Sequence, residues 1–524
     1  GILFLSVLAF QTVAYQFSPL YHEPFNPDLT MYINVGRGWI KGIIPYVDVL
    51  DAKGPALFEI FAFLAWAKWD HYLGVFVLCF LINSLSAVYI YKMCCLWYAK
   101  VVALVISVLA LAVMFNIFTG QASLCTEVFL LPLFALPAYY LIESFISNYP
   151  ISGWNAVAIG GILCILFWAK ISLIIPLLIP FAWWMLILNR KIAETKHCIT
   201  LRLIQVIISF IVGSLLVWTP LLLSRNFVGM LNVYLGGVAS NHSLGFSWRQ
   251  LVWTTSIYNL PGSGHSFAPI IWLFCWLCFV LLIVSKRISF QIKTMVVVSY
   301  FLSALLCNFY TYGATTLTFQ FQIIYFVIFG LADVSYWLSM KRVTQMIGIL
   351  TFFLVNLMFV LHTYNRITLN YAVRADKSIE IHTDKVGDYE VTFANTTIGY
   401  YYCNLSKHYF SSDFYSWGNF VASNQIAYYC CENRDAYVLG TNVFYAWAHQ
   451  DESLKETLDN STRKNVLENK YRYVMIYLSD ISNVEEDLNF KFLKNLGYEM
   501  VEIFNSSFAA PDRSFAVLFE LPPA

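Results

Sequence analysis

A succession of long apolar runs constrains what this chain can fold into more than any other feature. A bilayer core about 30 Å thick needs about 20 apolar residues, because each helical residue rises 1.5 Å. Runs that approach or meet this requirement lie at 1–20, 72–91, 101–119, 126–146, 154–169, 171–188, 202–223, 268–285, 293–310, 319–338 and 343–363. The fold class predicted from them is a polytopic α-helical membrane protein with about eleven spans.

The composition excludes several other classes. Hydrophobic residues make up 59% of the 524 residues and charged residues only 12%, whereas soluble domains carry roughly a quarter. The net charge is +1 and no lysine- or arginine-rich block occurs, so a nucleic-acid partner is excluded. No CxxC pair stands beside histidines, which argues against zinc. Cys403, Cys430 and Cys431, in the polar part, are either free thiols or contributors to a disulfide.

The basic residues of the short loops predict the orientation. With the spans above, four loops fall on one side, and they hold Lys92, Lys100, Arg190, Lys191, Lys196, Lys286, Arg287, Lys293, Lys341 and Arg342. Such loops are cytoplasmic under the positive-inside rule. The N-terminus is then inside. The first outer loop at 21–55, the loop at about 224–267 and everything after about 364 are outside.

The composition changes near Asn365, which divides the chain into a membrane domain at 1–364 and a polar domain at 365–524. The stretches "AYVLG", "RYVMIYL" and "FAVLFEL" are typical of strands. "DLNFKFLKNLGYEMVEIF" predicts a helix, a stop at Gly497 and a further strand. An extracytoplasmic α/β domain is therefore expected at the C-terminal end.

The first outer loop carries the strongest local signals. Asn26, Pro27 and Asp28 form a typical helix start, because Asn caps well, Pro suits the first position and Asp favours the dipole. Met31, Val35 and Trp39 then share one face of an amphipathic helix, which is expected to lie on the membrane surface. The run 56–67 is too short to span and is predicted as a second interfacial helix.

The segment after this helix, "GIIPYVDVLDAKGP" at 42–55, closely resembles a loop of the polyprenyl-phosphate-dependent glycosyltransferases of the GT-C fold. That family includes protein O-mannosyltransferases, the aminoarabinose transferase that modifies lipid A, and many bacterial relatives. "GQASLCTEVFLLPL" at 120–133 is similar to the family's acidic opening of the fourth span, and "FWAKISLI" at 167–174 places Lys170 where relatives often have Lys. The stretch "TFQFQIIY" at 318–325 departs from the family, since it lacks the His and Pro found there.

The resemblance implies that a sugar moves from a polyprenyl phosphate to an acceptor hydroxyl at the outer face, with inversion. Asp28 would act as base, and Glu127 would be a second acidic residue at the site. Lys53 would stabilise the donor phosphate. Arg225, Arg249 and His265 are further candidate cations for the phosphate, chosen because they are predicted on the outer side and have suitable chemistry. Lys170, at a family position, is either another phosphate contact or a snorkelling charge at the membrane edge.

Several roles stay open. Tyr32 and Tyr46 either stack on a sugar or belong to an interfacial aromatic belt. Asp48 and Asp51 are either solvated loop charges or contacts to sugar or acceptor. A divalent cation held by Asp28 or Glu127 would suit oxygen ligands, but nothing in the spacing requires one. The acceptor could be a glycan, a glycolipid or a protein, and the implied location is a bacterial plasma membrane.

Two other functions remain as alternatives. A lipid-linked sugar transporter or flippase would usually show internal repeats and charges near the bilayer midplane. Here no repeat is evident, and Asp28, Lys53, Glu127 and Lys170 are predicted at one surface. A polysaccharide polymerase or ligase that uses diphosphate-linked glycans would be expected to have large outer loops rich in Arg and His. The loop at 224–267 has only Arg225, Arg249, His242 and His265.

Overall fold

A computed structural model shows a largely helical chain that divides into two compact units. One unit comprises Gly1–Leu20, Tyr72–Thr219 and His242–Ala372, and the other comprises Tyr21–His71, Pro220–Asn241 and Val373–Ala524. The structure describes residues 1–15, 17–19, 27–42, 45–46, 53–119, 126–191, 196–236, 268–310, 320–333, 381–386, 389–394, 414–417, 460, 463–464, 466–468, 470–478, 484–505 and 515–522.

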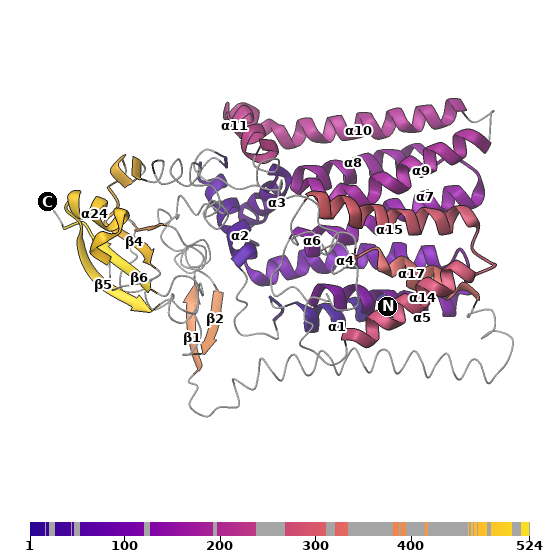
Figure 1. Cartoon of the computed structure of the whole chain (residues 1–524), viewed down its shortest axis with the longest axis horizontal. Helices are drawn as coiled ribbons and strands as arrows, with labels where there is room; N and C mark the ends of the chain where they lie inside the picture. The colour runs from indigo at the N-terminus through magenta and orange to yellow at the C-terminus, as the bar shows by residue number, and fades with distance from the viewer. Residues whose placement is uncertain are drawn as a thin grey trace. The chain divides into compact units, whose positions relative to one another are not determined.

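The first unit consists of helices, the long ones of which run side by side (Figure 1). They are α1 (Ile2–Ala14), α4 (Tyr72–Cys94), α5 (Lys100–Thr119), α6 (Thr126–Leu130), η1 (Leu131–Phe134), α7 (Ala135–Ser147), α8 (Gly153–Ala169), η2 (Ile171–Ile174), α9 (Ile175–Lys191), α10 (Lys196–Leu223, which runs on into the second unit), α14 (Ala268–Val284), α15 (Phe290–Tyr310) and α17 (Ile323–Gly330).

Within the described residues, three helical stretches are long and apolar enough to cross a membrane: Tyr72–Cys94, Thr126–Ser147 and Cys198–Leu223. The remaining apolar helices are shorter, and their positions follow the predicted runs. α17 covers only part of the run at 319–338, and the run at 343–363 lies outside the described residues. The number of about eleven spans therefore stays a prediction.

Polar side chains and small residues hold these helices together. The Gln11 amide donates to the Phe76 carbonyl at 2.7 Å, and Asn83 donates to Gln11 Oε1 at 2.9 Å and to the Tyr15 hydroxyl at 3.0 Å. These bonds tie α1 and the residue after it to α4. Between α8 and α10, a Cβ on Gly160 would lie 2.4 Å from the backbone carbonyl oxygen of Val206. Only a small residue permits that approach, as in other membrane helix pairs.

The second unit contains α2 (Pro27–Ile40), α3 (Pro55–Trp66), α11 (Phe227–Leu231), the π-helical turn η4 (Asn232–Gly236) and all the described strands. β1 (Ile381–Val386) pairs antiparallel with β2 (Tyr389–Ala394). A four-stranded sheet has the order β3 (Phe414–Trp417), β4 (Tyr473–Leu478), β6 (Phe515–Glu520) and β5 (Glu499–Asn505). β3 is parallel to β4, and the other pairings are antiparallel.

The short helices η5 (Val484–Glu486) and α24 (Leu488–Asn495) precede β5 along the chain. Phe490 and Leu493 of α24 share a buried core with Val474 of β4 and Val517 of β6. Asp487 caps α24 by accepting from the backbone N–H groups of residues 489 and 490, at 2.8 and 3.0 Å. Gly497, with φ +87°, ends it. The predicted order of strand, helix, glycine stop and strand is confirmed.

Two predicted features of the C-terminal part stay untested. The strand "AYVLG" and the cysteines at 403, 430 and 431 lie outside the described residues. β3 was not predicted, because its four residues are too few to give an alternating pattern.

Candidate functional site

α2 and α3 cross at very short range. A Cβ on Gly36 would lie 2.5 Å from the carbonyl carbon of Phe61, so no larger residue fits there without moving a backbone. The Tyr32 ring packs on the Phe61 ring, with 5.4 Å between centroids, and is fully buried. The glycine thus lets the two helices pack in close contact.

α2 is buried on all sides, which differs from the expected one-sided surface helix. Every described side chain from Leu29 to Arg37 is buried, including the polar Thr30 and Asn34. Arg37 forms an ion pair with the Asp70 carboxylate and also donates from Nη2 to the Asp70 carbonyl at 2.8 Å. These bonds compensate the cost of burying the guanidinium and fix the end of α2 against the segment that follows α3.

Asp28 lies in the first turn of α2, which begins at Pro27 as predicted. The backbone position is therefore the one expected for a carboxylate at a helix N-terminus. Its side chain is outside what the structure describes, as are Asp48 and Asp51 entirely. The roles assigned to these three residues stay predictions.

Tyr46 lies in a turn and holds the backbone of Lys53 by a hydrogen bond. The backbone of Tyr46 is left-handed, with φ 69°, an uncommon conformation for a bulky residue. Its hydroxyl donates to the Lys53 carbonyl at 2.8 Å, and its ring packs on Phe58 with 6.0 Å between centroids. The Lys53 ammonium lies 6.0 Å from the centroid of the Tyr32 ring, at the outer limit of a cation–π contact.

A residue from a distant segment also fixes this turn. The Asn226 amide, just after α10, donates to the Pro45 carbonyl at 2.8 Å and is buried. Tyr32 and Tyr46 are buried as well, so their rings support Lys53 and the turn rather than offering a surface to a sugar. Left-handed strain of this kind persists only where the surroundings enforce it, and such positions cluster at functional sites.

The first unit contributes a separate pair of charges. Glu127 lies in α6 with 1% of its surface exposed, and its Oε1 accepts from the Lys170 ammonium. Lys170 follows α8, and its extended backbone, with φ −164°, ends that helix. The structure thus joins two residues that were each selected from the sequence for a separate reason.

The remaining candidate cations are less informative. Arg225 is exposed in a left-handed turn after α10, with φ 57°, and its backbone N–H donates to the Leu222 carbonyl at 3.1 Å. Arg249 and His265 lie outside the described residues. Their assignment to the donor phosphate stays a prediction.

Among the described residues, those around Glu127 do not fit a metal ion. The Lys170 ammonium already neutralises this carboxylate, and a divalent cation there would be repelled by it. Among the residues that the structure describes, no group of three or more His, Cys, Asp or Glu side chains could hold a metal.

Sequence reasoning missed Glu59, Arg37 and Asn226. Arg37 gave a signal, since a charge inside an otherwise apolar helix needs a partner. Glu59 lies in α3, and its buried Oε1 has no hydrogen-bond partner among the described residues. Burial raises the pKa of the Glu59 carboxyl to about 8. This carboxyl is therefore largely protonated at neutral pH.

Glu59→Gln is expected to flatten the dependence of stability on pH. The unfolded chain releases the Glu59 proton near pH 4.5, whereas the folded chain keeps it until about pH 8. Stability therefore falls as pH rises through this window and levels off above it. Allowing for solvent screening, the variant should gain about 2 kcal/mol relative to wild type between pH 5 and pH 8. Denaturation of wild type and Glu59→Gln at the two pH values measures this difference in the free energy of unfolding.

Parallel profiles for wild type and Glu59→Gln would contradict the prediction.

The comparisons with known proteins identify no family for this chain. No family model matches, and no curated protein matches. Among the solved structures that match is the crystal structure of the Archaeoglobus fulgidus oligosaccharyltransferase in complex with Zn and sulfate. The match has 13% identity and a TM-score of 0.38, and it covers 97% of this chain and 72% of that one. A likeness this distant leaves the site to be argued from this chain's own residues.

Proposed function

We propose that this chain is a membrane glycosyltransferase that moves a sugar from a polyprenyl phosphate to an acceptor hydroxyl at the outer face of the membrane. The observation that carries the proposal is the position of Lys53. Its backbone is held by the Tyr46 turn and its ammonium lies over the Tyr32 ring, within the segment 42–55 that resembles the GT-C loop.

Lys53 would stabilise the leaving phosphate. As the bond from the sugar C1 to the phosphate oxygen breaks, negative charge builds on the phosphate. An ammonium fixed beforehand stabilises this charge without having to reorganise during the reaction. The buried rings of Tyr32 and Tyr46 and the short α2–α3 crossing at Gly36 supply that rigidity.

Asp28 would act as general base. The acceptor oxygen forms its bond to C1 on the face opposite the leaving phosphate, and its proton passes to the Asp28 carboxylate. One displacement of this kind inverts the anomeric centre and releases the polyprenyl phosphate. The first turn of α2 favours the ionised carboxylate that this role requires.

The pair of Glu127 and Lys170 would form the second charged element of the enzyme. We infer that the ion pair with Glu127 holds the Lys170 side chain in place. A role of Lys170 at the donor phosphate is what the GT-C resemblance implies. No step is assigned to a metal. The proposed setting is a bacterial plasma membrane, with a cytoplasmic N-terminus and the C-terminal domain outside. A glycan, glycolipid or protein is the acceptor.

The proposal is tested with the full chain in proteoliposomes and polyprenyl-phosphate-linked sugars. Transfer should require the lipid-phosphate sugar and should fail with a nucleotide sugar. Mass spectrometry of cell-envelope sugars, with and without the protein, then identifies the product. An unchanged envelope together with inactive proteoliposomes would contradict the proposal.

Lys53→Ala should lower kcat/KM for the donor by about 10²-fold, because the leaving phosphate loses its fixed cation. Lys41→Ala, at an exposed position just after α2, is the matched control and should change little. Asp48→Ala should also have a much smaller effect than Lys53→Ala. Equal losses from Lys53→Ala and Asp48→Ala would remove the phosphate assignment.

A further inference from the structure

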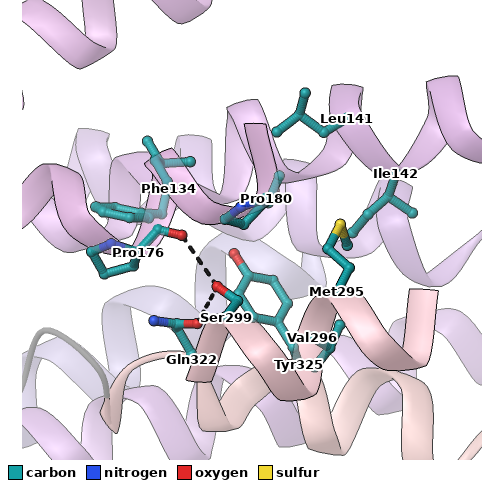
Figure 2. Close-up of a pocket in the computed structure, with 12 residues that line it drawn as sticks. Phe134, Leu141, Ile142, Pro176, Pro180, Met295, Val296, Ser299, Gln322 and Tyr325 are labelled. Carbon is teal, nitrogen blue, oxygen red and sulfur yellow. Dashed lines mark hydrogen bonds between the residues drawn. The ribbon is translucent and has the colours of Figure 1, made fainter. Parts of the chain in front are cut away.

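A small cavity lies inside the first unit, where η1, α7, α9, α15 and α17 meet (Figure 2). Its volume is about 30 Å³, and most of its wall is apolar, with Leu141, Leu177 and Val296 among the lining residues. One part of the wall is polar, because Ser299, Gln322 and Tyr325 also face the cavity. Gln322 and Tyr325 belong to the stretch "TFQFQIIY", where the sequence departs from the GT-C pattern.

A proline places a backbone carbonyl at this polar wall. Pro180 lies inside α9 and has no N–H, so the carbonyl four residues earlier, at Pro176, lacks its helical donor. The Ser299 hydroxyl lies 3.3 Å from the Pro176 carbonyl and 2.8 Å from Gln322 Oε1. A hydroxyl has one proton and cannot donate fully to both acceptors.

Two donors face the same cavity with no partner in the described part of the chain. They are the Gln322 amide nitrogen and the Tyr325 hydroxyl. Gln322 is 3% exposed and Tyr325 is 9% exposed. Figure 2 shows the Tyr325 hydroxyl directed toward the prolines of α9. Buried polar groups in native proteins are nearly always satisfied, so a partner for these donors is expected in the cavity.

The size of the cavity selects the partner. One water needs roughly 10–15 Å³ of such volume, so the cavity accommodates about two water molecules and excludes a sugar, a phosphate or a lipid headgroup. A hydrocarbon chain would leave both donors unsatisfied. Water can accept from Gln322 and Tyr325 and donate to Pro176, which provides the two to four polar partners that a buried water requires.

We propose that this cavity is a hydration site whose ordered waters bridge the Pro176 carbonyl of α9 to Gln322 and Tyr325. The waters replace the helical hydrogen bond that Pro180 removes. They also join α9 to Gln322, just before α17, and to Tyr325 within α17. The site is independent of the sugar-transfer chemistry. It explains how a proline-interrupted helix is accommodated among apolar neighbours.

X-ray hydroxyl-radical footprinting of the full chain in a membrane tests this directly, because radicals formed from a bound water oxidise the side chains beside it. Met295 lines the cavity and is 4% exposed, whereas Met114 of α5 is fully buried and does not line it. Met295 should be oxidised several-fold faster than Met114, and Gln322→Leu should abolish the difference. Equal rates in the wild type would show that the cavity is dry or filled by lipid, and would overturn the proposal.

Tyr325→Phe gives a second test, because the direction of its effect on Tm distinguishes a hydrated cavity from a dry one. If water occupies the cavity, the variant loses a hydrogen bond and its Tm should fall by a few degrees. If the cavity is dry, the variant removes an unsatisfied buried hydroxyl, and its Tm should rise. A rise in Tm would overturn the proposal.

Discussion

Asp28→Asn is expected to lower the rate of sugar transfer by up to about 10⁴-fold, the upper range for loss of a general base. The amide has nearly the same shape as the carboxylate and still suits the first turn of α2, so the fold should persist. Because the amide cannot take the acceptor proton, kcat should fall while donor binding is retained. Single-turnover transfer and a donor-binding assay on the same proteoliposomes separate the two effects.

Asp28→Glu provides a second measurement of the same role. A carboxylate moved by one methylene should restore part of the rate, since the chemistry is kept and only the geometry is altered. Asp70→Asn is not a suitable control, because Asp70 pairs with Arg37 and its loss would disturb α2 itself. Asp48→Asn is the better match. Full turnover by Asp28→Asn would remove Asp28 from catalysis.

Lys170→Met is expected to destabilise the first unit by about 3–5 kcal/mol, because it leaves the Glu127 carboxylate buried without its cation. Glu127 is 1% exposed, so water cannot replace the ammonium at low cost. Denaturation of the protein in detergent measures the loss. Lys92→Met is the matched control, because Lys92 is exposed and lies over the Tyr89 ring rather than beside a carboxylate.

The double variant Glu127→Gln/Lys170→Met should recover most of the stability, because no buried charge remains. The difference between the double variant and the sum of the single variants gives the coupling energy of the pair. Unchanged stability in Lys170→Met alone would mean that the two side chains do not depend on each other.

Local structure was largely predictable because its signals are local. The apolar runs at 72–91 and 126–146 correspond to α4 and to the Thr126–Ser147 span. The proline at 27 marks the start of α2, and Gly497 ends α24 where the pattern required. Each of these rests on side-chain periodicity or backbone freedom within a few residues.

The burial of α2 was not predictable in the same way. Its apolar residues suggested one buried face, but Gly36 permits a crossing with α3 that a hydropathy pattern does not encode. Asp70, 33 residues after the buried Arg37, supplies it with both a carboxylate and a carbonyl. The partner of a buried charge is set by packing, and a single sequence does not reveal it.

Residue patterns alone predicted an apolar, helical chain and the order of helix and strand near its C-terminal end, and they selected the residues that could carry charge at a site. How those residues are used depends on the tertiary structure. It pairs Lys170 with Glu127, bends Tyr46 into a turn that positions Lys53, and gathers Gln322, Tyr325 and Pro176 around one cavity. The reason is physical: helices and strands follow from periodicities of a few residues, whereas these contacts depend on how distant segments pack.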